Sequence, residues 1–510
     1  MMALPYLMII PLFGAFSMPM VSLAGRKARG AWAVLISGAT LAVGSWVFYR
    51  VYEKGTVLYT LGAKSPLGQA NFPIRIVWEV DLFGALMVLM VAFVSFMAVL
   101  YSLGYMRHDT GLDKYYTLIL ILELGMLGIA ITGDLFNFYV FLEIMSIASY
   151  ALVAFRNDTQ EGIEAGIKYM LVGSMASSLI LLGIALLYGQ YGTLTMGYLA
   201  LKLSQNATVV GKVALALLIS GLLFKSGASP VHMWLADAHP AAPSSISAML
   251  SGLVIKIGGI YALARIAFSV YGISISVKTV GWLIILFACI TLIVGNAMAV
   301  IQTDMKRLLA YSSVGQIGYI LLGIGIGLAA YGSRTGEIAL AGAIYHTFNH
   351  ALMKGLLFLI AGAVIHQLGT RDLNDLSGLA KTMPKTTFAF LIGAAAIVGM
   401  PPLNGFASKW LIYESSALFN PVLGAIAIIG TAFCTAAYVR VLYTFFGRPS
   451  EKVMEAKDPE KSMLWPMVIL TIAIIVMGLF PWGISDKVMI PAARALENQL
   501  AYVATLMGGG

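Results

Sequence analysis

Residues 222–234 read LLFKSGASPVHMW, an apolar stretch in which Lys225 stands beside a break made by Gly and Pro. Residues 399–413, GMPPLNGFASKWLIY, show the same combination with Lys409. A lysine at the centre of a bilayer costs about 3 kcal/mol or more, so such residues usually face an internal polar pathway. We therefore interpret the two lysines as parts of a transport site within a membrane.

The rest of the chain is a succession of apolar runs of about twenty residues, the length that crosses a bilayer as a helix. Of its 510 residues, 60% are hydrophobic and 11% are charged. The sequence therefore predicts an all-α polytopic membrane protein with about 14 transmembrane helices. The first run is too long for a signal peptide and follows no basic region, so we expect it to remain as a span. The tail after residue 485 fits either a short interfacial helix or a frayed end. The expected spans lie near residues 4–23, 31–52, 80–105, 115–133, 135–155, 167–188, 211–235, 243–270, 280–302, 308–330, 338–366, 385–417, 421–446 and 464–485.

The charged and sulfur-containing residues exclude several classes of protein. A net charge of +9 would suggest nucleic-acid binding in a soluble protein, but the basic residues favour alternate loops, as the positive-inside rule requires, so we expect no nucleic-acid partner. Arg265 and Arg440 fall toward span ends, from which their side chains are expected to extend to the interface. Cys289 and Cys434 are isolated in apolar helices, which excludes an Fe–S cluster or a Cys-based zinc site supplied by this chain alone. There is no nucleotide-binding fingerprint either, so we expect no cofactor and no metal, and the energy must come from an ion gradient or from partner subunits.

Spans 4–8 and spans 9–13 form two blocks of five helices, and the fourth helix of each block is the broken one. Because five is odd, the second block must enter the membrane from the opposite side, which predicts an inverted repeat with ion sites at the broken helices. Freed backbone groups at the breaks favour hydrated cavities there. Alternatively, the prolines are ordinary kinks and the lysines pair with structural partners. The predicted domains are an N-terminal three-span segment (1–110), the first five-helix repeat (111–272), the second (273–447), and a C-terminal span with its tail (448–510).

Ionisable residues within the spans indicate a path for protons. Glu143 lies at the middle of its span, too far from either end to reach water. It is either protonated and silent, or paired with a buried cation such as Lys225. Lys256 also occupies a span midpoint, where a lysine can serve in a proton relay. Glu123 is the other clearly buried acid.

One further span, IYHTFNHALMKGLLF at 344–358, carries three titratable residues. His346, His350 and Lys354 are spaced by four, so they lie on one face of the helix. A histidine pair at this spacing can bind zinc, but no third ligand is evident, and the three groups together favour a proton path. Another set falls at the end of span 7 and in the loop after it, where it forms either an entrance for protons or a group of solvated loop residues: His232, Asp237 and His239.

Four segments resemble a known family: GDLFNFYVFLEIMSIASYALVAF (133–155), KSGASPVHMWLADAHPAAPSSISAMLSGLVIKIGGIYALAR (225–265), DMKRLLAYSSVGQIGY (304–319) and HALMKGLLFLIAG (350–362). They are similar to the antiporter-like proton-translocating subunits of respiratory complex I (the L, M and N types), Mrp-type Na+/H+ antiporters and energy-converting membrane-bound hydrogenases. The resemblance covers roughly residues 70–450. The first segment most resembles the D-type component of Mrp antiporters and its counterpart, the H-type component, in archaeal membrane-bound hydrogenase.

The resemblance implies a role for each matching residue. Glu143 and Lys225 match the family's glutamate on span 5 and its lysine partner on broken span 7. Lys306 matches a family lysine at the start of span 10, although the sequence alone makes it an ordinary positive-inside residue. The remaining matches continue the path through the second half and are, in order, Lys256, then His346 and His350, and finally Lys409 as the terminal lysine.

We therefore expect a proton-translocating component of a multisubunit ion-pumping complex, located in a prokaryotic plasma membrane and not catalytic by itself. The expected partners are other Mrp-like membrane subunits, a hydrogenase or NADH-oxidising module, the lipid bilayer, and protons, with sodium moved indirectly. The alternatives are a stand-alone secondary transporter of an organic solute and a structural scaffold subunit of a redox complex. Accessory roles are expected for Lys354, His232, Asp237, His239 and Glu123.

Overall fold

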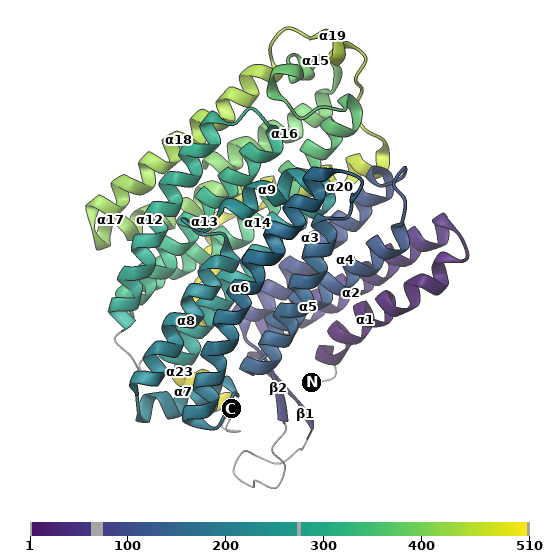
Figure 1. Cartoon of the computed structure of the whole chain (residues 1–510). Coiled ribbons are helices and arrows are strands. Elements are labelled where there is room, and N and C mark those ends of the chain that lie inside the picture. The colour runs from purple at the N-terminus through teal and green to yellow at the C-terminus, as the bar shows by residue number, and fades with distance from the viewer. Residues whose placement is uncertain (1–2, 63–74, 273–276, 507–510) are drawn as a thin grey trace.

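The computed structural model describes residues 3–62, 75–272 and 277–506, which form one bundle of long helices (Figure 1). Within these ranges, 13 helices are long and apolar enough to cross a membrane. One further span consists of two shorter helices, α16 (Pro384–Val398) and α17 (Asn404–Phe419). Together with the 13 unbroken helices, this broken span gives the number of transmembrane helices expected from the sequence. The all-α polytopic prediction is confirmed. The predicted boundary at residue 273 lies outside the described residues.

The spanning helices follow one another along the chain in two halves. In the first half they are α1 (Ala3–Ser22), α2 (Arg26–Lys54), α3 (Leu82–Tyr105), α4 (Leu112–Ile131), α5 (Leu135–Val153), α6 (Gln160–Tyr191), α8 (Val209–Ser226) and the helical stretch Ser244–Tyr271. In the second half they are α12 (Val277–Ile301), α13 (Met305–Ala329), α14 (Arg334–Leu368), the pair α16 and α17, α18 (Pro421–Phe445) and α20 (Lys461–Leu479).

Side chains just before several helices determine where those helices begin. The carboxylate of Asp134 accepts hydrogen bonds from the first turn of α5, and the carboxylate of Asp304 accepts one from the first turn of α13. The hydroxyls of Thr208 and Ser333 do the same for α8 and α14. Such caps satisfy backbone N–H groups that a helix leaves free at its start.

Two helical stretches form the buried centre of the bundle. The most apolar part of α13 and of the stretch Ser244–Tyr271 is entirely buried inside the bundle. The stretch is irregular, because three parts of it wind as π-helix: η1 (Leu250–Val254), η2 (Lys256–Tyr261) and η3 (Arg265–Tyr271). π-Helical turns are rare and occur frequently at functional sites.

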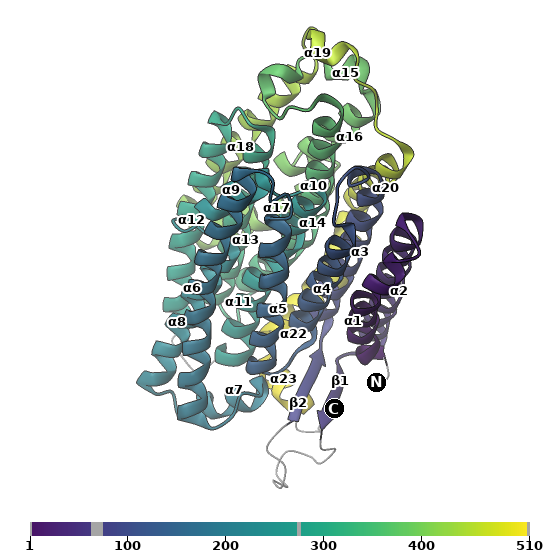
Figure 2. The same cartoon turned by 45° about the vertical axis from the view of Figure 1, so that its right-hand side comes forward.

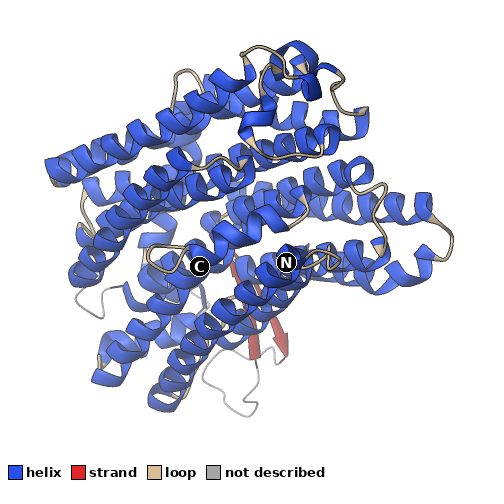
Figure 3. Ribbon diagram, turned by 45° about the horizontal axis from the view of Figure 1, so that its top comes forward, coloured by secondary structure: helices blue, strands red, loops and turns tan. Residues whose placement is uncertain are grey.

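A short β-hairpin lies at one end of the bundle, between the second and third spans. Strand β1 (Val57–Gly62) runs antiparallel to β2 (Arg75–Val80), with Val57 opposite Val80. Both strands are rich in β-branched and aromatic residues, which favour strands. The short helices α7 (Met196–Gln205) and α23 (Gln499–Leu506) lie at the same end (Figures 1 and 2). This end is called the hairpin side below, and in Figure 3 the hairpin is the red element among blue helices.

The described part of the C-terminal segment, up to residue 506, is packed against the bundle rather than frayed. It forms α22 (Ile490–Glu497) and α23, and α22 contacts α14 and α3. Gln499 Nε2 donates to the carbonyl oxygens of Ser269 and Val270 at 3.3 and 2.9 Å. Tyr331 OH donates to the carbonyl of Glu497 at 2.7 Å.

Arg265 does not extend to the interface, so that expectation is wrong. Its side chain is buried and makes a two-pronged ion pair with Asp81, which precedes α3. The Nη1–Oδ2 and Nη2–Oδ1 distances are 2.6 and 2.7 Å. Arg440 is half-buried, and its Nη1 donates to the Val300 carbonyl at 2.7 Å.

Candidate functional site

The first broken helix directs Lys225 toward α5. α8 ends at Ser226, and Gly227 follows with a φ of +71°, a conformation that glycine adopts without strain. Lys225 Nζ is buried and donates to Ser146 Oγ at 2.8 Å and to Tyr150 OH at 3.2 Å. The break therefore places an ammonium group against two hydroxyls of α5.

Glu143 lies on the same stripe of α5, three residues before Ser146. It is half-buried rather than fully buried, and Ser177 Oγ of α6 donates to its Oε1. Among the ion pairs of the described residues, none joins Glu143 to Lys225. The direct pair considered from the sequence is therefore absent, and Lys225 contacts Ser146, one turn further along α5, instead.

A cavity of about 420 Å³ lies beside this first break, between α8 and α12. Ser229, within the break, donates its N–H to Thr291 Oγ1 of α12 at 3.0 Å. The lining is mostly apolar and includes Leu215, Phe224 and Leu283. The hydration expected at this break is therefore not supplied by this cavity.

Lys256 is wholly buried on the π-helical stretch η2. Its Nζ donates to the carbonyl of Ser251. The hydroxyl of Ser251 lies 2.7 Å from that of Ser313 on α13, and Ser313 in turn donates to the Leu309 carbonyl at 2.9 Å. A chain of small polar groups thus leads from Lys256 to the next helix.

Lys354 of α14 reaches the same turn of α13 from the other side. Its Nζ donates to the Leu309 carbonyl at 2.7 Å, to Ser312 Oγ, and to Tyr438 OH at 3.2 Å. The Leu309 carbonyl therefore accepts from Lys354 and from the serine that contacts Ser251. Lys256 and Lys354, which belong to different spans, are thus linked through hydroxyl and carbonyl groups of one turn of α13.

His346 continues the line toward the second break. Its Nδ1 lies 2.9 Å from Ser408 Oγ and its Nε2 lies 3.0 Å from Gln316 Oε1. Because an amide oxygen only accepts, Nε2 carries a proton in this arrangement. The ring of His350 is stacked on that of His346 with centroids 6.0 Å apart, and its nitrogens have no hydrogen-bond partner among the described residues.

Lys409 is buried just after the second break. Its Nζ donates to the Val398 carbonyl at 3.3 Å and lies 4.6 Å from the centre of the Tyr319 ring, a cation–π contact. A Cβ at Gly399 would lie 3.0 Å from Lys409 Cδ, and the φ of Gly399 is +93°. Glycine is therefore required there both for the turn and for the space that the lysine occupies.

The second break is held by a pair of asparagines. Asn349 Nδ2 donates to the Asn404 carbonyl at 2.8 Å, and Asn404 Nδ2 donates to Asn349 Oδ1 at 3.1 Å. Asn349 lies on α14 between the two histidines. The helix that carries the histidines therefore also fixes the backbone of the broken span.

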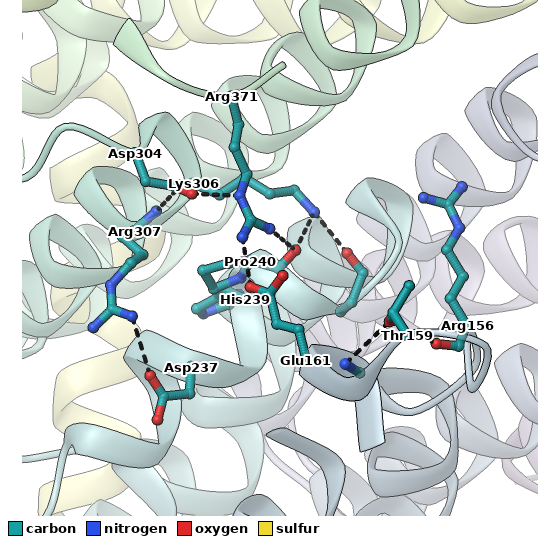
Figure 4. Close-up of polar contacts among 12 residues, drawn as sticks. Arg156, Thr159, Glu161, Asp237, His239, Pro240, Asp304, Lys306, Arg307 and Arg371 are labelled. Carbon is teal, nitrogen blue, oxygen red and sulfur yellow. Dashed lines mark hydrogen bonds and ion pairs between the residues drawn. The ribbon is translucent and has the colours of Figure 1, made fainter. Parts of the chain in front are cut away.

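Ion pairs surround α9 (Met233–Ala241), the helix that follows the first break, on the side opposite the hairpin (Figures 2 and 4). Asp237 belongs to this network and is partly exposed. The entrance considered from the sequence for His232, Asp237 and His239 stays a prediction, and Asp237 lies within a charged cluster. The pairs are Asp237 with Lys168 (3.2 Å) and Arg307 (3.4 Å), and Arg371 with Asp304 (2.5 Å) and Glu161 (2.6 Å).

His239 and Lys306 lie beneath this network (Figure 4). His239 is 1% exposed, and its ring stacks on Phe358 at 4.7 Å. Lys306 is 3% exposed and donates to the Ala242 carbonyl at 2.6 Å, so it is not the ordinary loop lysine that the sequence suggested. His232 is also buried, with its ring 6.0 Å from that of Tyr311. Asp237 thus stands apart from the two histidines with which the sequence groups it.

Glu123 is wholly buried on α4, and its carboxylate oxygens have no hydrogen-bond partner among the described residues. It is therefore not joined by hydrogen bonds to the lysine and histidine residues above. Within the described ranges, no group of three or more His, Cys, Asp or Glu side chains is placed to hold a metal ion.

Sequence reasoning missed the uncharged members of the site. They are Ser146, Ser251, Ser313, Gln316 and Tyr438, which contact the lysines, His346 or one another. Their signal in the sequence is weak, because hydroxyl and amide side chains occur in many membrane helices. The stretch YSSVGQ at 311–316 is the clearest instance.

Known proteins resemble this chain in sequence and in fold. Residues 132–435 match the family model described as "NADH:quinone oxidoreductase/Mrp antiporter, TM", and residues 67–116 match the N-terminus of complex I chain 5. The N-type component of the NADH-quinone oxidoreductase of Desulforudis audaxviator is 34% identical, covering 95% of this chain and 97% of the relative. The D-type component of the Na+/H+ antiporter of Alkalihalophilus pseudofirmus is 32% identical, covering 86% of each chain.

Two further likenesses concern redox complexes. Component B of hydrogenase-4 from Escherichia coli is 33% identical over 84% of this chain and 66% of its own length. A chain of the archaeal membrane-bound sulfane sulfur reductase superposes with a TM-score of 0.87 at 33% identity, covering 99% of each chain. The chain therefore belongs to the family of membrane subunits shared by NADH:quinone oxidoreductases and Mrp antiporters.

Proposed function

We propose that this chain translocates protons as an antiporter-like member of a multisubunit ion-pumping complex in a prokaryotic plasma membrane. The complex is of the Mrp type and works within a membrane-bound hydrogenase or a related redox complex. The relatives named above support this assignment, because they include Mrp, hydrogenase and sulfur-reducing assemblies. The chain itself supplies the membrane path and not the redox chemistry.

The observation that carries the proposal is the row of buried cationic residues between the two helix breaks. Lys225 lies at one break and Lys409 at the other, and both are at least nine-tenths buried. Lys256, Lys354 and His346 lie between them, each in contact with hydroxyl, carbonyl or amide groups. So many buried titratable groups are costly in a packed apolar core, whereas a proton relay requires them.

Electrostatic coupling between neighbouring groups provides the mechanism. Like charges held close together in a medium of low dielectric constant repel, so a proton that arrives at one group favours release from the next. Glu143 provides a carboxyl group at one end of the row, one turn before Ser146, the serine that Lys225 contacts. A change in the separation of Glu143 and Lys225, imposed by a partner subunit, therefore shifts the occupancy of the whole row. Steps without a direct hydrogen bond require a bridging water.

The inverted repeat and its boundaries stay a prediction. The two helix breaks support it, since each begins with a left-handed glycine and each lies next to a buried lysine. Under this arrangement, Lys225 and Lys409 occupy equivalent places in the two halves, so that one half takes up protons and the other releases them.

Replacing Lys256 with methionine tests the proposed path at its centre. We expect Lys256→Met to lower the initial rate of proton movement at least about tenfold, because it removes a proton-transfer group while keeping most of the side-chain volume. Proton movement is measured with a pH-sensitive dye in proteoliposomes that contain the whole complex. Lys457→Met, in an exposed loop, is the control and should be without effect.

The same experiment separates the alternatives. A scaffold subunit would show normal proton movement in every Lys256→Met complex that assembles. A stand-alone solute transporter would move an organic solute when the chain is reconstituted alone. Either result would contradict the proposal.

Replacing Ser146 with alanine tests the link between Glu143 and Lys225. We expect Ser146→Ala to slow proton movement several-fold without abolishing it, because Lys225 keeps its contact with Tyr150. Ser178→Ala is a suitable control, since Ser178 is exposed on α6. Equal rates for Ser146→Ala and the unmodified complex would show that the serine is not part of the path.

A further inference from the structure

A second polar site lies on the hairpin side, away from the row of lysines. It is a cavity of about 220 Å³ between strand β2, the start of α3 and the C-terminal helices. Figure 2 shows this place, where α22 and α23 approach the hairpin. Its lining includes Glu79, Asp81, Arg494, Asn498 and Tyr502.

Glu79 is the unusual member of this lining. Its side chain is 3% exposed, and neither carboxylate oxygen makes a hydrogen bond of normal geometry among the described residues, although Tyr502 lies close enough to favour the charged form. Asp81, two residues later, is by contrast fully engaged by Arg265 and by the N–H of Gly84 at 2.8 Å. A buried carboxylate without a partner is costly, so Glu79 must either carry a proton or hold a ligand in the cavity.

The charges around Glu79 favour the proton. Burial, together with the charge of Asp81, raises the pKa of Glu79 well above its ordinary value, against the smaller opposing effects of Arg265 and Tyr502. Arg494 also faces the cavity, but it is paired with Glu337 of α14 at 2.5 Å. One excess negative charge therefore remains in the cavity, and a single proton neutralises it.

The cavity is connected to the helix that carries Lys256. Arg265 Nη2 donates to Tyr261 OH at 3.3 Å, and Tyr261 lies on the same π-helical stretch as Lys256, five residues further on. Tyr261 OH in turn donates to the Ala130 carbonyl of α4 at 2.9 Å. Polar groups thus extend from the cavity toward the centre of the bundle.

We propose that this cavity is where the chain exchanges protons with water on the hairpin side, and that Glu79 is the group that accepts and releases them. The exchange rests on the function proposed above. In each cycle the Glu79 carboxylate takes one proton from a hydronium ion, which becomes water, and the neutral carboxyl later returns that proton to water. The C-terminal helix α23, whose Tyr502 lines the cavity, forms part of its wall and gives the tail a role.

Infrared difference spectroscopy of the whole complex tests the protonation directly and does not depend on transport. The complex is titrated in D2O buffers, and the carbonyl band of protonated carboxyl groups is followed. We expect a band that disappears at least about one pH unit above the ordinary glutamate pKa of about 4.3. It should be absent in Glu79→Gln and present in Glu53→Gln, a matched control in which an exposed glutamate at the end of α2 is changed.

Proton movement in proteoliposomes tests the role in exchange. We expect Glu79→Gln to lower the rate at least about fivefold, and Glu79→Asp, which keeps the carboxyl group, to restore most of it. Assembly of each variant is checked by the amount of chain recovered in the complex. The recovery by Glu79→Asp separates a role in exchange from mere loss of structure.

Three results would overturn the inference. They are a carboxyl band that titrates in Glu79→Gln as it does in the unmodified complex, a midpoint that falls as NaCl is added because a sodium ion occupies the cavity, and an unchanged rate in Glu79→Gln. Failure of the function proposed above would appear instead as normal proton movement in Lys256→Met, whatever the outcome of the Glu79 titration.

Discussion

Replacing Lys225 with alanine is expected to abolish proton movement by the assembled complex, with a loss of at least about 100-fold in initial rate, the scale on which positioned proton-transfer groups act. Lys225 donates to two hydroxyls of α5 and lies at the break that opens the row of buried cations. Without Lys225, no cation contacts Ser146, one turn from Glu143 on α5. The rate is measured with a pH-sensitive dye in proteoliposomes that contain the complex with its own partner subunits.

Lys212→Ala is the matched control, because Lys212 is an exposed lysine on the same helix, α8. Glu143→Ala is expected to give the same loss as Lys225→Ala, since the two charges act as a pair. The complex should still assemble in each variant, as neither side chain makes an ion pair that holds helices together among the described residues. Unimpaired proton movement in both variants would contradict the proposed role of this chain in proton translocation.

Replacing Arg265 with methionine is expected to destabilise the chain by about 3–5 kcal/mol, the usual cost of leaving one member of a buried ion pair without its partner. Arg265 and Asp81 are both at least nine-tenths buried, and their two short contacts join the stretch Ser244–Tyr271 to the start of α3. The measurement is the thermal unfolding of the purified complex, together with the amount of chain recovered in it.

Arg494→Met provides the comparison for this second effect. The ion pair of Arg494 with Glu337 has an arginine side chain that is 68% exposed, so its loss should cost no more than about 1 kcal/mol. The double variant Asp81→Asn, Arg265→Met should recover part of the stability lost in Arg265→Met, because Asp81 then leaves no uncompensated charge. Equal stability of Arg265→Met and the unmodified chain would show that the pair has no structural role.

The broken helices and their lysines are predictable because each signal is local. A cation within an apolar run, next to glycine and proline, conflicts with membrane burial at that point in the chain. Lys225 and Lys409 both lie where this reasoning puts them, buried beside left-handed glycines. The transmembrane spans are predictable for the same reason, since helix length and apolar content are properties of contiguous residues.

The mistaken predictions concern contacts between distant parts of the sequence. The sequence places Arg265 at the interface, but its partner Asp81 lies 184 residues earlier, and no local pattern joins the two. The sequence also makes Lys306 a loop lysine, but the carbonyl that holds it belongs to Ala242, 64 residues earlier. A side chain at a helix end can lie in water or beneath a neighbouring loop, and only the packing decides which.

The uncharged residues of the site could not be predicted from the sequence for a different reason. Ser313 and Gln316 are ordinary members of a membrane helix by composition, and they gain importance only because Ser251 and His346 lie opposite them. The mid-span position of Glu143 predicts burial, yet α5 leaves this residue half-exposed in this chain. Position along a helix determines depth in the membrane, but which face is covered depends on the neighbouring helices.

The central claim is that protons cross this chain along the row of residues from Lys225 to Lys409. Its most direct test is the number of protons moved per turnover of the partner reaction, measured in the same proteoliposomes for Lys225→Ala, Lys409→Ala and the control Lys457→Met. We predict that this ratio falls at least about tenfold in the first two variants and is unchanged in the control. An unchanged ratio in complexes that contain Lys225→Ala or Lys409→Ala chains would contradict it.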